Sequence, residues 1–97
     1  MNSLKEIKKI LADHKEEFGQ RYKVKEIGIF GSVVRGEQKK KSDIDILVEF
    51  ESPIGLFKFL ELEEYMGDLL DTKVDLVSKK ALKPRIGKHI LQEVLKI

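Results

Sequence analysis

Residues 31–50 have the sequence GSVVRGEQKKKSDIDILVEF, and this stretch decides the fold class and the candidate site. Its second half alternates in polarity. The apolar side chains of Ile44, Ile46 and Val48 fall on one face of an extended chain, and Asp43 and Asp45 fall on the other. Alternation of this kind predicts a half-buried strand over residues 43–50.

Asp43 and Asp45 are the unusual residues of this strand. In an extended chain their Cα atoms lie roughly 6–7 Å apart and their side chains share a face. Neighbouring like charges repel, and aspartate is a poor strand former. A divalent cation would relieve the repulsion, and oxygen ligands without cysteine or clustered histidine favour Mg²⁺ or Mn²⁺ over zinc. We therefore interpret both residues as metal ligands and catalytic residues.

Asp75 repeats this pattern in a second apolar segment, residues 74–77. Val74 and Leu76 point to one side of the expected strand, whereas Asp75 points to the other. If this strand lies beside residues 43–50, three carboxylates converge. Three carboxylates suffice for two Mg²⁺ ions about 3.5–4 Å apart, the usual arrangement for phosphoryl displacement. Asp75 is therefore the third predicted metal ligand and catalytic residue.

Gly31 and Ser32 supply the second half of the predicted site. Glycine at the end of a strand lets the backbone approach a ligand closely. The amides that follow and the Ser32 hydroxyl are suited to phosphate groups, particularly where a short helix begins. Arg35 adds a charged donor for the same phosphates. We predict that Gly31, Ser32 and Arg35 bind the nucleotide.

The order of the flanking elements predicts the fold class. Helical periodicity opens with a capping box between Ser3 and Glu6 and is expected to stop at Gly19. The expected elements are a helix over 4–18, strands over 24–30 and 43–50, a helix over 56–70, a strand over 74–77 and a helix over 86–95. This order predicts an α/β (α+β) domain with a small mixed sheet of three to four strands, helices mainly on one face and the site on the other.

Size and composition restrict the class of protein further. The 97 residues suit a single domain over 1–97, with 41% apolar and 37% charged residues and no cysteine. The sequence shows no membrane-spanning run and no signal-peptide pattern, so we expect a cytoplasmic protein without a membrane partner. The net charge of only +2 gives no reason to expect direct nucleic-acid binding. Lys39, Lys40 and Lys41 predict a solvated loop or, alternatively, a segment that steers ATP or an acidic partner.

These residues together resemble a known family. Gly-Ser, ten further residues and Asp-x-Asp form the signature of the DNA polymerase beta-like nucleotidyltransferase superfamily. RGE after Gly-Ser, the strand SDIDILV, the downstream KVDLV and the closing ALKP are similar to its minimal nucleotidyltransferase antitoxin branch. The resemblance covers nearly the whole chain and implies the nucleotidyltransferase fold.

The resemblance also implies a reaction and a partner. Members of the branch are commonly antitoxins that form hetero-oligomers with a HEPN-domain toxin and transfer AMP from ATP to a tyrosine hydroxyl of that toxin. By this resemblance Asp43 and Asp45 hold metal, Asp75 holds metal and helps to activate the hydroxyl, and Gly31 and Ser32 hold the β- and γ-phosphates.

Two alternatives to this enzyme remain open on the residues alone. One is a partner-binding antitoxin with little or no catalysis, which acts by steric contact. The other is nucleotidyl transfer to a small-molecule hydroxyl, which in related enzymes usually needs a second domain to bind the acceptor.

Overall fold

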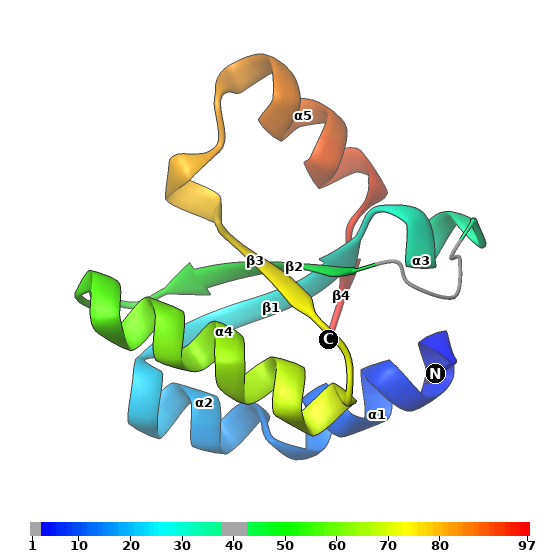
Figure 1. Cartoon of the computed structure of the whole chain (residues 1–97). Helices are drawn as coiled ribbons and strands as arrows, with labels where there is room; N and C mark the ends of the chain where they lie inside the picture. The colour runs from blue at the N-terminus through cyan, green and yellow to red at the C-terminus, as the bar shows by residue number, and fades with distance from the viewer. Residues whose placement is uncertain (1–2, 38–42) are drawn as a thin grey trace.

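The computed structural model describes residues 3–37 and 43–97, which form a four-stranded mixed sheet with helices packed against it (Figure 1). The predicted α/β class with a small mixed sheet is confirmed. In chain order the described elements are α1 (Leu4–Asp13), α2 (Lys15–Tyr22), β1 (Val24–Phe30), α3 (Ser32–Arg35), β2 (Ile44–Phe50), α4 (Leu56–Leu70), β3 (Val74–Ser78), the 3-10 helix η1 (Lys79–Ala81), α5 (Pro84–Glu93) and β4 (Leu95–Lys96).

The sheet has the strand order β3-β2-β1-β4. Strand β2 runs antiparallel to β1 and parallel to β3, and β4 pairs antiparallel with the other side of β1. The sheet is therefore mixed, and β2 is held by a neighbour on each side. Strand β3 lies at one edge of the sheet.

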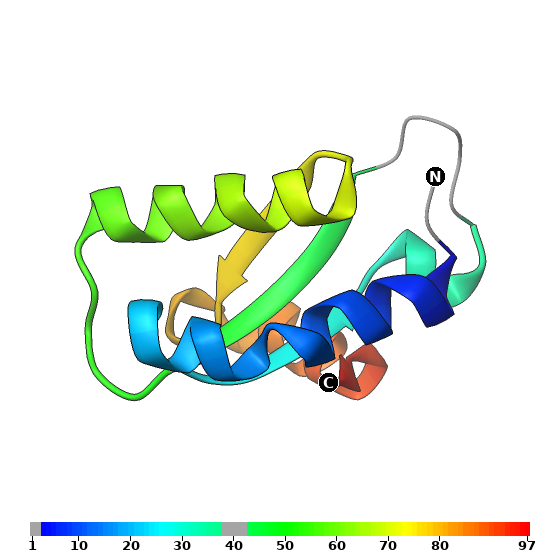
Figure 2. The same cartoon turned by 90° about the horizontal axis from the view of Figure 1, so that it is seen from below.

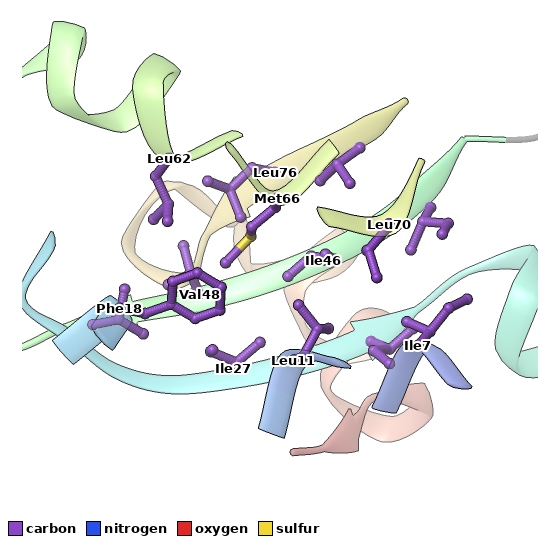
Figure 3. Packing of buried hydrophobic residues seen from close by; sticks show 14 of the residues in the cluster. Ile7, Leu11, Phe18, Ile27, Ile46, Val48, Leu62, Met66, Leu70 and Leu76 are labelled. Atoms are coloured by element: carbon purple, nitrogen blue, oxygen red, sulfur yellow. The ribbon is translucent and has the colours of Figure 1, made fainter. Parts of the chain in front are cut away.

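The hydrophobic core lies between the sheet and the helices α1, α2 and α4, which cover one face (Figures 1 and 2). Strand β2 contributes the fully buried side chains of Ile44, Ile46 and Val48, as the alternating pattern predicts. The three helices contribute Ile7, Leu11, Phe18, Leu62, Met66 and Leu70, whose apolar atoms meet those of the sheet (Figure 3). This packing fixes which face of β2 is left for the aspartates.

The first helical segment differs from the prediction, because Gly19 does not end it. The chain breaks at His14 instead, whose ring Nδ1 donates a hydrogen bond to the Ile10 carbonyl oxygen at 2.8 Å. Gly19 lies inside α2, which continues to Tyr22 and ends at Lys23 in the left-handed conformation, with φ 59°. The extra turn places Tyr22 in the core, where its side chain is 1% exposed, and this burial outweighs the tendency of glycine to stop a helix.

The last predicted helix also ends earlier than expected. Helix α5 stops at Glu93, Val94 is extended, and Leu95 pairs with Ile29 in a short fourth strand. Gly28 makes this possible, because a Cβ at its position would overlap the Val94 side chain. The apolar spacing of Val94 and Leu95 fits a helix, but pairing with the free edge of β1 is the arrangement that forms.

Helix α5 stands on the face of the sheet opposite α1, α2 and α4 (Figure 1). The prediction of helices mainly on one face therefore holds for three of the long helices, and α5 is the exception. Since α5 covers only part of its face, the remainder is left for polar residues. Within residues 3–37 and 43–97, no helix is both long enough and apolar enough to cross a membrane.

Candidate active site

Asp45 and Asp75 are neighbours on the face of the sheet that the three core helices leave uncovered. They are Cα partners in the parallel ladder between β2 and β3. The residues before and after each of them are buried in the core, so strand alternation turns both aspartates to the opposite face. Asp45 is half-buried and Asp75 is exposed at the sheet edge. Two strands thus bring two carboxylates into register.

Gly31 lies directly against the Asp45 carboxylate. It follows β1 with φ 82° and ψ −155°, a conformation that residues with a Cβ rarely adopt. A Cβ at this position would overlap Asp45 Oδ2 and would lie 3.0 Å from Asp45 Cγ. Backbone conformation and close packing therefore both require glycine at this position.

The surroundings of Asp45 change the pKa of its carboxyl group. Burial raises the pKa of the Asp45 carboxyl above its usual value, and the negative charges of Asp75 and Asp43 raise it further. Arg35 opposes the shift. Asp43 precedes β2, and its Oδ2 lies 3.8 Å from Nζ of Lys73. Asp75 and Asp43 are therefore both close enough to Asp45 to repel its charge.

The donor set of this face suits a divalent cation that is shared with a phosphate substrate. Among the described residues, no three Asp, Glu, His or Cys side chains already converge as a complete metal-binding group. Mg²⁺ does not need such a group, because it usually takes one or two carboxylates and completes its shell with water and phosphate oxygens. Asp45 and Asp75 could supply those carboxylates, and the repulsion of Asp45 by Asp75 is the feature a cation would relieve.

Ser32 and Arg35 begin and end the single turn of α3, which starts immediately after Gly31. The Gly31 carbonyl oxygen accepts hydrogen bonds from the amides of Val34 and Arg35 at 3.1 and 3.3 Å, which fixes the turn. Arg35 is not free in this structure. Its Nε donates to Glu37 Oε1 at 2.8 Å, and its guanidinium also pairs with a second carboxylate.

That second carboxylate belongs to Glu93, a site residue that the sequence analysis missed. Glu93 Oε2 accepts a hydrogen bond from the Gly31 amide at 3.3 Å, and Oε1 accepts one from Arg35 at 2.5 Å. The Arg35 contact, together with the Gly31 amide, lowers the pKa of Glu93. Glu93 also contributes to the raised pKa of Asp45. No local pattern marks this residue, because its partners lie about sixty positions away in the chain.

The lysine run at residues 39–41 lies outside the described residues, so both interpretations of it remain predictions. The six predicted site residues, by contrast, all lie within the described part. Asp45, Asp75 and Gly31 form the centre of the site, whereas Ser32 and Arg35 flank it on α3.

Comparisons with known proteins show the family to which this chain belongs. A family model for the nucleotidyltransferase domain matches residues 11–97. The chain belongs to the nucleotidyltransferase family. This nucleotidyltransferase is 55% identical over 95 residues to the protein adenylyltransferase MntA of Thermococcus cleftensis, covering 98% of this chain and 96% of the relative.

Two solved structures are similar to this nucleotidyltransferase along nearly its whole length. One, a minimal nucleotidyltransferase, is 31% identical with a TM-score of 0.76, covering 94% of this chain and 95% of the other. The second comes from a toxin–antitoxin crystal structure with AMP-PNP. It is 28% identical with a TM-score of 0.71, covering 93% of this chain and 68% of the other. The expected nucleotidyltransferase fold is therefore confirmed.

The crowding of carboxylates in this nucleotidyltransferase predicts a pH-dependent stability effect of Asp45→Asn. Because the folded-state pKa of Asp45 is raised, the folded state holds this proton more tightly than the unfolded state, and ionisation as the pH rises destabilises the fold. Without divalent cations, we expect the variant to gain about 0.2–1 kcal/mol in free energy of unfolding relative to the parent near neutral pH. The gain should shrink toward about pH 4, near the ordinary pKa of aspartate.

Urea denaturation of both proteins at the two pH values, with EDTA present, measures this difference. The three glutamates whose pKa is lowered, Glu17, Glu61 and Glu93, are present in both proteins, so their contributions largely cancel. Asp68→Asn, on the exposed side of α4, is the matched control and should show no such trend. A variant that is less stable than the parent near pH 7 would contradict the prediction.

Proposed function

We propose that this nucleotidyltransferase transfers AMP from ATP to a tyrosine hydroxyl of a HEPN-domain toxin, and that residues 1–97 act as one minimal domain. Two contacts of Asp45 carry the proposal. Asp45 is the Cα partner of Asp75 in the parallel ladder, and Gly31 packs against the Asp45 carboxylate. The relative named a protein adenylyltransferase supports AMP transfer to a protein. The similar toxin–antitoxin structure with AMP-PNP supports both an ATP substrate and a toxin partner.

In this proposal Asp43, Asp45 and Asp75 would hold Mg²⁺, which would supply positive charge against the phosphate oxygens. Gly31, Ser32 and Arg35 hold the β- and γ-phosphates. The tyrosine oxygen forms a bond to the α-phosphorus, the bond from that phosphorus to the β-bridging oxygen breaks, and pyrophosphate leaves. The hydroxyl proton passes to the Asp75 carboxylate, which lies beside Asp45 and is exposed toward an incoming acceptor.

The openness of the site favours a macromolecular acceptor. Asp75 is exposed and β3 is an edge strand, so a substrate approaching from this edge meets little cover from the described residues. A small hydroxyl compound would be poorly held by such a surface, because small-molecule sites usually bury most of their ligand. A protein brings its own surface to the contact.

Incubation with labelled ATP, Mg²⁺ and the HEPN-domain partner of the proposal tests the proposed function. We expect label on a tyrosine of the partner, release of one pyrophosphate for each AMP transferred, and loss of both products when EDTA removes the divalent cation. Mass spectrometry of the partner identifies the modified residue. Label on a small hydroxyl compound without the partner would favour the small-molecule alternative. Protection from the toxin by a chain that labels nothing would favour the steric one.

A further inference from the structure

Glu93 occupies the donors that the proposed function gives to phosphate groups. Its two carboxylate oxygens are divided between the Gly31 amide, at 3.3 Å, and the Arg35 guanidinium, at 2.5 Å. A backbone amide and a guanidinium are also the donors that proteins use for phosphate oxygens. A carboxylate in this position therefore makes the contacts that a phosphate would make.

The charges around Arg35 mean that Glu93 and a bound phosphate would compete for the same donors. Arg35 already pairs with two carboxylates, those of Glu37 and Glu93, so its positive charge is more than neutralised before any nucleotide arrives. Asp45 receives an unfavourable contribution from Glu93 in addition to those from Asp75 and Asp43. An incoming triphosphate would add several negative charges to this group. Glu93 and the phosphates therefore compete for the same positive charge and for the same amide.

The position of Glu93 also allows its carboxylate to be displaced from the Gly31 amide and from Arg35. It is the last residue of α5, the helix that stands apart from the core helices (Figure 1). Its side chain is 16% exposed, whereas that of Arg35 is 49% exposed, so water reaches both partners. Val94, which follows, packs beside Gly28 and fixes the end of α5 near the site. Because Glu93 precedes the residues of β4 that pair with β1, a rotamer change of its side chain would free both donors while that pairing is kept.

We propose that Glu93 sets the affinity of the site for the nucleoside triphosphate by occupying the Gly31 amide and Arg35 until the phosphates displace it. This inference rests on the assignment of these donors to phosphates under the proposed function. The apparent affinity equals the intrinsic affinity multiplied by the fraction of molecules in which the donors are free, so removing the competing carboxylate raises the apparent affinity.

Direct binding of AMP-PNP with Mg²⁺ to Glu93→Gln and Glu93→Ala tests the proposal by calorimetry. Glutamine keeps the shape of the side chain, but it has a single acceptor oxygen for the two donors and carries no charge to compete. We expect each variant to lower the Kd about two- to fivefold, within the range for losing one partly exposed charge pair. If Glu93 instead serves to hold Gly31 and Arg35 in place, the alanine variant will bind more weakly than the parent.

Controls separate this inference from the proposed function. Glu51→Gln makes the same change of charge at an exposed residue beyond the far end of β2, and it should leave the Kd unchanged. Thermal unfolding shows that each variant is folded, and the isosteric glutamine variant decides the question if the alanine variant is not. Parent-like or weaker binding by Glu93→Gln, with clear binding by the parent, overturns the inference alone. Absence of binding by the parent and both variants overturns the proposed function as well.

Discussion

Replacing Asp45 with asparagine is expected to lower the rate of AMP transfer by about 100- to 1,000-fold, the usual loss when one preorganised electrostatic group is removed. Asp45 lies at the centre of the site, with Asp75 beside it across the ladder and Gly31 packed against its carboxylate. Asparagine keeps the size of the side chain but removes its charge. The loss should therefore appear in kcat for labelled-ATP transfer to the partner, with the fold intact.

Asp68→Asn is again the matched control, since the same substitution on exposed α4 should leave kcat within twofold of the parent, about 0.4 kcal/mol or less. The earlier stability prediction sharpens the comparison, because Asp45→Asn should be inactive and yet no less stable near neutral pH. An active Asp45→Asn protein would contradict the central place of this carboxylate. An inactive but unfolded protein would contradict the stability prediction.

Replacing Gly31 with alanine is expected to have the largest combined effect on stability and activity. At φ 82° a residue with a Cβ is strained, at a cost on the order of 1–3 kcal/mol. The new methyl group would also overlap Asp45 Oδ2, so either the loop or the carboxylate must move. We expect a lower free energy of unfolding and loss of AMP transfer, measured by urea denaturation and by the labelling assay.

Gly36→Ala provides an unusually close control for this experiment. Gly36 also has a positive φ of 73°, but a Cβ there meets no atom within 4 Å among the described residues. It should therefore show the conformational cost alone, while transfer activity is retained. If the two variants lose stability and activity equally, the contact between Gly31 and Asp45 is not what matters.

The parts of the fold that the sequence predicted share one property, which is a strong local pattern. The alternation around Ile44 and Ile46 located β2 within one residue, and the apolar spacing of α4 gave its limits. The errors came where tertiary contacts override local preference. Gly19 continues a helix because the next turn buries Tyr22, and Leu95 forms a strand because β1 has a free edge.

In the candidate site, too, the residues with a local sequence pattern could be predicted and those fixed by tertiary contacts could not. Asp45 and Asp75 could be placed on one face from alternation alone, given only that their strands are neighbours. Glu93 could not be found, because its position depends on how α5 returns over the sheet and on the space that Gly28 leaves for Val94. Nor could the sequence show that Arg35 is already paired.

The parallel register of β2 and β3 has a consequence for how this chain can change during evolution. Only residues 71–73 separate α4 from β3, and they hold Asp75 opposite Asp45. Inserting or deleting one residue there would slide β3 by one position and turn Asp75 into the core. Substitutions in this turn can accumulate, but changes of length cannot. Descendants of this enzyme should therefore vary in the composition of the turn while keeping its length.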